Sequence, residues 1–239
     1  MRPLQGCMNN SLIIAPHPDD SPLACGGTIV KILLEGGDVR VVNMTDGRNS
    51  HLATFGISEK PTPDELAEIR RNEELDSASV LGIPHGNLTF LGFEDGALGK
   101  YVEEAKEELI RILSANFPDE IYVPARTDRH PDHVAANLAI MAALRELQRP
   151  VAVLEYTTWT KSHLDTDDRV QPVLAHEGLV RVNDITGFLG LKRLAIEQHQ
   201  SQIALNPRWP LQAKPVLDED FLRPYFERPM ERFVETRMF

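Results

Sequence analysis

Two short segments of the chain combine histidine with aspartate, the residue types best suited to metal-assisted hydrolysis. They read His17-Pro18-Asp19-Asp20 and His130-Pro131-Asp132-His133. Imidazole nitrogens and carboxylate oxygens are zinc ligands, and a catalytic zinc takes three protein ligands and leaves one position for water. Two histidines and one carboxylate would meet that count, and the remaining acids could serve as a base or orient the imidazoles. We interpret the two segments as one divalent metal site, whose ligand types also suit Fe2+.

Each segment also has a purely structural interpretation. Asp19, Asp20 and Ser21 could satisfy free backbone N–H groups at a helix start, and Pro131-Asp132 is typical of a first helical turn. That interpretation stays open for either segment alone. Two His-Pro-Asp triplets in one chain are far more than composition predicts, and this repetition favours the metal site.

The two segments must be brought together by the elements around them. Apolar runs bounded by Pro, Gly or polar residues predict strands, and apolar residues at helical spacing predict helices between them. The predicted strands are residues 11–15, 39–44, 88–91, 120–123, 151–156 and 179–182. The predicted helices are residues 21–35, 63–81, 102–115, 131–147 and 188–203, and residues 45–63 are predicted to be a long loop.

This alternation predicts an α/β fold, a Rossmann-like three-layer sandwich with a mostly parallel sheet and helices on both faces. Ligands of such folds bind at the carboxyl ends of strands, and both His17 and His130 follow a predicted strand. We expect a single domain over residues 1–239, with a core at about 11–160 and a C-terminal part, 161–239, packed on it. The proline-rich end of that part predicts a tail that wraps around the domain.

The composition excludes several classes of function. The formal net charge is −11 and no basic block exceeds two residues, so the footprint of a nucleic-acid-binding protein is missing. No apolar run approaches the roughly 18 residues of a membrane span. Two cysteines are too few for a disulfide framework, and Cys25 in its apolar setting predicts a buried free thiol. We expect a cytoplasmic protein with neither nucleic acid nor membrane as its partner.

The motifs resemble those of the GlcNAc-phosphatidylinositol de-N-acetylase family, also called LmbE-like. The family's opening motif, Pro-His-Pro-Asp-Asp-Glu followed by a Cys-Gly-Gly-Thr helix start, is matched at residues 16–20 and 25–28, and its His-Pro-Asp-His motif is complete at 130–133. Weaker matches follow in the family's order at residues 45–47, 70–73, 95–96, 155–159, 192–202 and 231–233. The resemblance implies zinc-dependent removal of an acetyl group from an N-acetylglucosamine-type sugar conjugate, by a protein that is often an oligomer.

The resemblance also implies a role for each residue of the metal site. His17, Asp20 and His133 correspond to the metal ligands. Asp19 corresponds to the general base that activates the water.

Further roles follow for the residues around that site. His130 corresponds to the group that stabilises the oxyanion or protonates the leaving amine, and Asp132 to its tuning partner. Substrate binding is expected of Arg70, Asp46 and Asp95. For Arg70, a solvated charge network with neighbouring glutamates is an equally open interpretation.

The chain departs from the family pattern at two positions. The glutamate of the opening motif is Ser21 here, which puts in doubt the support of Asp20 and the start of the following helix. A tyrosine that often precedes the second motif is Asp128 here, so assistance by a tyrosine is not expected at this position.

Amide hydrolysis is the favoured hypothesis, and two alternatives stay open. One is another metal-assisted reaction of water on the same fold, by a hydratase or an amidase with a non-sugar substrate. The other is a non-catalytic sugar- or nucleotide-binding module, although residues 25–27 do not form a dinucleotide fingerprint.

The remaining histidines and one tryptophan have simpler interpretations. His199 is expected to have a structural role on a helix, and Trp159 to be a packing residue. His51 lies in the long loop, which could border the site. Surface positions are expected for His85, His163 and His176.

Overall fold

A single seven-stranded sheet forms the centre of the computed structural model, which describes residues 9–158 and 179–239. The strand order is β3-β2-β1-β4-β5-β7-β6. The strands are β1 (Asn10–Ala15), β2 (Asp38–Thr45), β3 (Leu88–Phe93), β4 (Glu120–Pro124), β5 (Val151–Tyr156), β6 (Leu179–Asp184) and β7 (Met230–Met238). The first five pair in parallel, whereas β7 runs antiparallel to both of its neighbours. The prediction of a mostly parallel sheet is confirmed.

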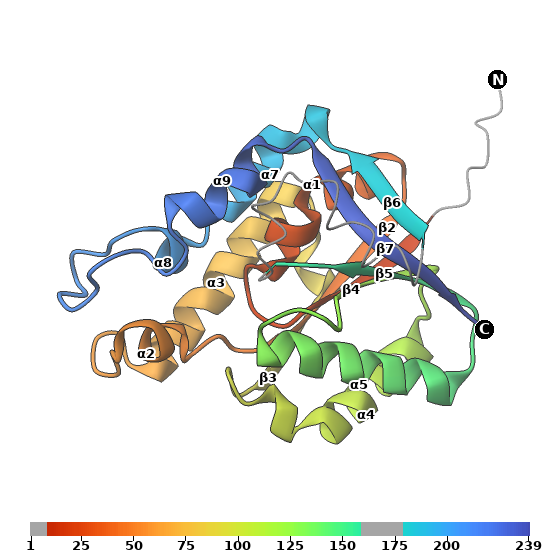
Figure 1. The fold of residues 1–239 in the computed structure, drawn as a ribbon, viewed down its shortest axis with the longest axis horizontal. Coiled ribbons are helices and arrows are strands. Elements are labelled where there is room, and N and C mark those ends of the chain that lie inside the picture. The colour runs from red at the N-terminus through yellow and green to blue at the C-terminus, as the bar shows by residue number, and fades with distance from the viewer. Residues whose placement is uncertain (1–8, 159–178) are drawn as a thin grey trace.

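Helices cover both faces of this sheet (Figure 1). One face carries α1 (Asp20–Leu34), α3 (Pro63–Leu81) and α7 (Leu189–Ile196), with α9 (Glu219–Glu227) packed on α7. The other face carries α4 (Val102–Ala115) and α5 (Pro131–Leu147). Two short helices, α2 (Ser50–Phe55) and α8 (Gln200–Ile203), complete the described helices apart from short 3-10 turns. The predicted three-layer sandwich is therefore confirmed.

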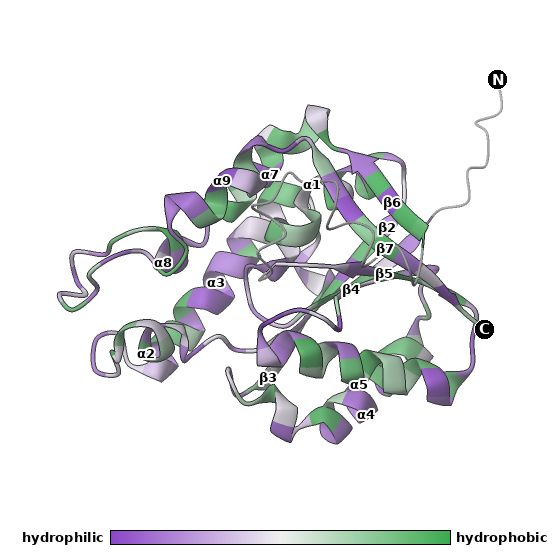
Figure 2. Ribbon diagram, viewed as in Figure 1, coloured by the Kyte–Doolittle hydropathy of each residue, from purple (hydrophilic) through white to green (hydrophobic). Residues whose placement is uncertain are grey.

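The alternation of side chains along β1 divides the core into two layers. Leu12 and Ile14 point to the face covered by α4 and α5, while Ile13 and Ala15 point to the face covered by α1, α3 and α7. All four are fully buried. The helices show the complementary pattern, and α5 alternates hydrophobic and hydrophilic segments in Figure 2, as expected of a helix with one face on the sheet.

The strand order places the two His-Pro-Asp segments side by side. β1 is paired with β2 on one side and with β4 on the other, so the connections leave β1 and β4 in opposite directions. This is the switch point at which the loops of a doubly wound sheet diverge and leave a crevice. His17 follows β1 and His130 follows β4, so both lie at this crevice.

Three local predictions were wrong. The expected loop over residues 45–63 contains α2, and the expected helix over 188–203 is interrupted between α7 and α8. The proline-rich end is not only a wrapping tail. It ends in a strand of nine residues, β7, which lies inside the sheet between β5 and β6. The buried residues of β7 include the charged Glu231 and the consecutive Phe233 and Val234, so its sequence lacks the clean alternation of apolar and polar residues that indicates a strand.

A buried ion pair ties the C-terminal part of the chain to α1. Glu231 of β7 accepts hydrogen bonds from the backbone N–H groups of Gly27 (3.0 Å) and Thr28 (2.7 Å) and from Nζ of Lys192 (2.7 Å). A Cβ atom at Gly26 would lie 2.9 Å from Cγ of Lys192. The Cys-Gly-Gly-Thr pattern therefore reflects close packing of α1 against α7 and β7. The neighbouring Cys25 is a buried free thiol, as predicted.

No helix within residues 9–158 and 179–239 is both long and apolar enough to cross a membrane.

Candidate metal centre and active site

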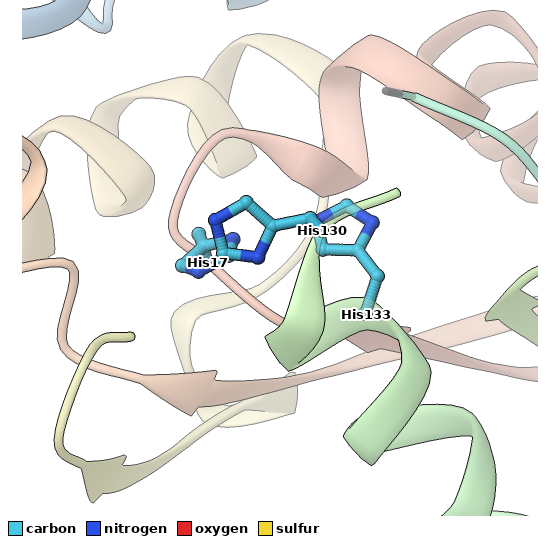
Figure 3. Close-up of side chains that lie close together, drawn as sticks. All are labelled: His17, His130 and His133. Atoms are coloured by element: carbon cyan, nitrogen blue, oxygen red, sulfur yellow. The ribbon is translucent and has the colours of Figure 1, made fainter. Parts of the chain in front are cut away.

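Three imidazole rings converge at the crevice between β1 and β4 (Figure 3). His17 comes from the loop after β1, and His130 and His133 come from the start of α5. The ring centroid of His17 lies 4.6 Å from that of His130 and 5.4 Å from that of His133, and the last two lie 5.2 Å apart. The structure thus brings together the histidines that the sequence predicted to meet.

Both nitrogens of His17 face carboxylates. Nδ1 lies 3.2 Å from Oδ2 of Asp20. On the other side of the ring, Nε2 lies 3.1 Å from Oδ1 of Asp95 and 3.2 Å from Oδ2 of Asp132. Asp132 is itself fixed by the backbone N–H groups of Gly96 and Leu98. The orientation of the His17 ring is therefore set by carboxylates that the backbone around them holds in place.

His133 has a similar arrangement. Its Nδ1 lies 3.1 Å from Oγ1 of Thr158 and 3.4 Å from Oδ2 of Asp128, so that edge of the ring is occupied. Its Nε2 lies 3.2 Å from Oδ2 of Asp20. That contact lacks the geometry of a hydrogen bond, which leaves Nε2 a buried polar atom without a hydrogen-bond partner. A buried polar atom of this kind calls for an explanation, and coordination of an ion is one of the standard explanations.

These contacts fit a metal ion. Nδ1 of His17, Oδ2 of Asp20 and Nε2 of His133 form a two-histidine, one-carboxylate donor set, in which Asp20 lies between the two imidazoles. Each imidazole has its other nitrogen against a carboxylate, the arrangement that orients metal-bound histidines. The ring nitrogens of His17, His130 and His133 form a second possible set. Among the described residues, only this set and the third one below have all their donor atoms within 4.8 Å of one another. We favour the first set, because Nδ1 of His130 already accepts the N–H of Asp132 at 3.2 Å.

A third possible set consists of His17, Asp95 and Asp132. Oxygens of both carboxylates accept backbone hydrogen bonds, from Asn49 to Asp95 and from the two residues named above to Asp132. The contacts of Asp95 and Asp132 are therefore explained by their role in orienting the His17 ring, without a metal ion between them.

Opposing effects determine the charges of Asp20 and His133. Burial alone would raise the pKa of Asp20, but the neighbouring His133 and His17 outweigh it and hold that pKa well below its usual range. Burial opposes protonation of His133, yet Asp20 and Asp128 raise its pKa to about 8. Without an ion the carboxylate and the imidazoles hold protons between them, and a bound cation would displace those protons.

Asp19 has a strained backbone and is held by a buried arginine. Its φ is 120°, which is rare for a residue other than glycine. Nη2 of Arg70 lies 2.9 Å from Oδ2 of Asp19 and also bonds to the carbonyl of Pro18 at 2.5 Å. Nη1 of Arg70 donates to the carbonyl of Gly47 at 3.1 Å. Strain retained in this way is typical of functional sites.

Burial raises the pKa of Asp19 to about 7, although Arg70 opposes the shift. A carboxyl group of that pKa can exchange a proton near neutral pH. Gly47 makes the arrangement possible, because a Cβ atom there would collide with the guanidinium of Arg70. Arg70 is buried against Asp19. This burial excludes the alternative interpretation of Arg70 as part of a solvated charge network.

One ring nitrogen of His130 accepts a backbone hydrogen bond. Since Nδ1 accepts the backbone N–H of Asp132, the proton of the neutral ring resides on Nε2. Burial lowers the pKa of His130 to about 4, and the nearby His17 and His133 add to the shift. The ring is therefore a neutral N–H donor at physiological pH in the structure.

The other predicted site residues lie in different surroundings. Asp46 pairs with Arg48, with Oδ2 2.6 Å from Nε, and no contact joins it to the three histidines. Asp95 contacts His17 rather than open space, and its carboxylate accepts the N–H of Asn49. The substrate-binding role given to Asp46 and Asp95 stays a prediction.

Asp128 is a site residue whose role the sequence did not reveal. It was noted only for the absence of a tyrosine, yet it is buried against His133 and accepts the backbone N–H groups of His130 and Thr158. Its contacts span the loop and the end of β5, and no local pattern in the sequence predicts them.

Ser21, which replaces the glutamate of the family motif, contacts a carboxyl group on α3. The Ser21 hydroxyl donates to Oε1 of Glu74 at 3.1 Å, and Nδ2 of Asn43 reaches the same oxygen at 3.4 Å. Oε2 of Glu74 lies 3.6 Å from Nε2 of His199. Burial raises the pKa of Glu74 to about 8 and lowers that of His199 to about 3.

The structural role expected of His199 agrees with its complete burial. His51 lies in α2 and not in a loop, and it is buried with Nε2 3.0 Å from the carbonyl of Ser201. His85 lies near the surface against Ser79. Trp159, His163 and His176 lie outside the described residues.

Known proteins are similar to this chain in sequence. The family model described as "PIG-L: GlcNAc-PI de-N-acetylase" matches residues 12–144, which is 133 of 239 residues. A diacetylchitobiose deacetylase of Thermococcus kodakarensis is 33% identical over 126 residues, which cover 51% of this chain and 44% of that protein. A 1D-myo-inositol 2-acetamido-2-deoxy-alpha-D-glucopyranoside deacetylase of Mycobacteroides abscessus is 25% identical, with 82% of each chain covered.

A solved structure extends the similarity to the whole fold. The N,N'-diacetylchitobiose deacetylase of Pyrococcus horikoshii, complexed with its inhibitor MPG, superposes with a TM-score of 0.70 at 26% identity. The match covers 95% of this chain and 84% of that one. It therefore includes the C-terminal part that lies beyond residues 12–144.

Proposed function

The chain belongs to the GlcNAc-PI de-N-acetylase family, and from this premise we propose that it hydrolyses the N-acetyl amide of an N-acetylglucosamine-type sugar conjugate. The observation that carries the proposal is the donor set around Asp20, with one imidazole on each side and a strained, arginine-anchored Asp19 next to it. The relatives named above are deacetylases of such sugars. They do not support the hydratase or the binding-module alternative.

We propose that His17, Asp20 and His133 hold zinc. The unpartnered Nε2 of His133 and the shared oxygen of Asp20 support this assignment. Zinc bound there would polarise the acetyl carbonyl and make water a stronger acid. Asp95 and Asp132 keep His17 in register, and Asp128 and Thr158 do so for His133.

Asp19 is proposed as the general base. Its carboxylate accepts a proton from the attacking water while the water oxygen bonds to the acetyl carbon. Arg70 holds the carboxylate in place and favours its ionised form. When the carbon–nitrogen bond breaks, the same proton passes to the leaving amine, so the products are acetate and a free amino sugar.

His130 is proposed as the donor to the oxyanion. In the neutral ring the proton resides on Nε2, and this N–H group can donate to the carbonyl oxygen as negative charge develops there. A well-placed donor of this kind contributes about 3–4 kcal/mol. The backbone N–H of Asp132 fixes the tautomer that makes this donation possible.

An acetate-release assay tests the proposal. The protein is purified without chelator, its zinc and iron are quantified, and it is incubated with N-acetylglucosaminyl inositol, N-acetylglucosaminyl malate and diacetylchitobiose. We expect about one equivalent of metal per chain and acetate release from at least one sugar, lost on chelation and restored by added zinc. Metal-free protein that releases no acetate from any of the three, with or without zinc, would contradict it.

We also propose that the protein is a homo-oligomer. The edge strand β6 exposes apolar side chains, with Leu179 77% and Val182 47% accessible. Exposed apolar edge strands are usually covered or paired. Light scattering of the purified protein measures its mass directly, and a monomer at micromolar concentration would exclude the proposal. A cytoplasmic location is likewise a proposal, to be tested by cell fractionation.

A further inference from the structure

A buried polar cluster lies behind the metal centre and has no role in the mechanism above. It consists of Ser21, Asn43, Glu74 and His199, all of them 2% exposed or less. Glu74 is its centre, since Oε1 accepts both the Ser21 hydroxyl and the Asn43 amide, and Oε2 faces His199. A carboxyl group so far from solvent requires a reason.

The cluster is poorly satisfied, so it does not owe its presence to stability alone. Oε2 of Glu74 and both ring nitrogens of His199 have no hydrogen-bond partner among the described residues. Each such atom lowers the stability of the folded chain when it is buried. An apolar side chain at position 74 would remove the unpartnered Oε2 but would leave the Ser21 hydroxyl and the Asn43 amide without their acceptor, so the carboxyl group is tied to the segment that carries Asp20.

The position of Glu74 shows what it could serve. Arg70 and Glu74 are four residues apart on α3 and therefore lie on the same face of that helix. Arg70 holds Asp19, and Glu74 holds Ser21. The two contacts fix the residues immediately before and after Asp20, so α3 restrains the backbone on both sides of Asp20.

We propose that Glu74 is a positioning residue that holds Asp20 in register through Ser21, and that it supplies from α3 the carboxyl group that the family motif carries at position 21. The inference rests on the proposed function for its catalytic meaning. Its structural content concerns only the placement of Asp20 and can be measured without turnover.

A swap of the carboxyl group between the two positions tests this proposal. The variants are E74L, E74Q, S21E and S21E/E74L, with E68L as a control at an exposed position of α3. The first readout is zinc affinity, from competition with a chromophoric chelator, and the second is kcat and KM for acetate release. Circular dichroism and thermal melting verify the fold of each variant.

The structure predicts a specific order of affinities. E74L should bind zinc about 10- to 100-fold more weakly than the natural chain, the usual cost of removing a group that orients a ligand. E74Q should stay within about threefold, because its amide oxygen can accept both hydrogen bonds. S21E alone should also weaken zinc binding by at least about tenfold, since two carboxyl groups would share one buried space. In S21E/E74L the affinity should recover to within about fivefold, and kcat should follow while KM changes little.

Each outcome decides the question. Recovery in S21E/E74L supports the proposal even if the natural chain releases no acetate, in which case only the proposed function fails. An E74L variant that matches the natural chain in zinc affinity and kcat overturns it. If E74L does not fold, refolding together with zinc binding in S21E/E74L supports the proposal, and failure of both variants to fold overturns it. E68L should match the natural chain throughout.

Discussion

Replacement of Asp19 by Asn separates the chemistry of the site from its architecture. Asparagine has the size of aspartate, tolerates positive φ better than most residues, and can still accept the hydrogen bond of Arg70 through its amide oxygen. It cannot accept a proton from water. The substitution therefore removes the proposed base and leaves the donors of His17, Asp20 and His133 in place.

Two magnitudes follow from the structure. Loss of the base should lower kcat for acetate release by about 10²- to 10⁴-fold, which corresponds to roughly 3–5 kcal/mol of activation free energy. The free energy of unfolding should change by less than about 1 kcal/mol at neutral pH, because the raised pKa of Asp19 shows that its charge is not stabilising in the folded chain, and Asn keeps the hydrogen bond of Arg70. Zinc stoichiometry should not change.

The pH profile supplies an independent measure. Burial raises the pKa of Asp19 to about 7, and a bound cation would lower it, so kcat/KM of the natural chain should fall below an apparent pKa of 7 or less. That acidic limb should vanish in D19N. The assay is acetate release from the best substrate at pH 5–9, with D76N, an exposed change on α3, as the control. Full activity in zinc-loaded D19N, or an unchanged acidic limb, would refute the assignment of Asp19 as the base.

Three further predictions concern the neighbours of this residue and the C-terminal part. A Cβ atom at Gly47 collides with Arg70, so G47A should lower kcat by about tenfold or more while zinc stays bound; unchanged kinetics would show that Arg70 can move without consequence. K192M leaves Glu231 buried without its partner and should lower the free energy of unfolding in urea by about 3–5 kcal/mol, whereas a loss under 1 kcal/mol would contradict a stabilising pair. The pKa of Glu74 is about 8 in the folded chain and near 4.5 when unfolded, so its contribution to the free energy of unfolding is complete below pH 4.5 and is lost as the pH rises toward 8. In urea titrations, the free energy of unfolding of E74Q should therefore decrease less between pH 4.5 and 8 than that of the natural chain. The same decrease in both proteins would exclude a raised pKa.

Local patterns were sufficient for most of the fold. The helices over 63–81, 102–115 and 131–147 have the predicted bounds. Proline and a capping side chain mark the starts of the first and the last of them, and a glycine marks the end of the first. The start of α3 shows the reason, since Thr62 and Glu65 form a capping box next to Pro63. β7 was missed because its pattern of buried and charged residues is weak without knowledge of the two strands that cover its edges.

The two His-Pro-Asp segments were visible in the sequence because metal chemistry requires these residue types, and the strand before each segment predicted that they would meet. The sequence by itself thus determined the family and the fold class, and it predicted that the histidines and aspartates of the two segments would come together. Only the tertiary structure decided which nitrogen of His17 faces Asp20, that Asp128 lies behind His133, and that Glu74 contacts Ser21. The physical reason is the separation along the sequence over which the interactions act. Capping and periodicity act over a few residues and leave a trace in the sequence, whereas the contact between Glu74 and Ser21 depends on how α3 and α1 pack, and helix packing follows no local pattern.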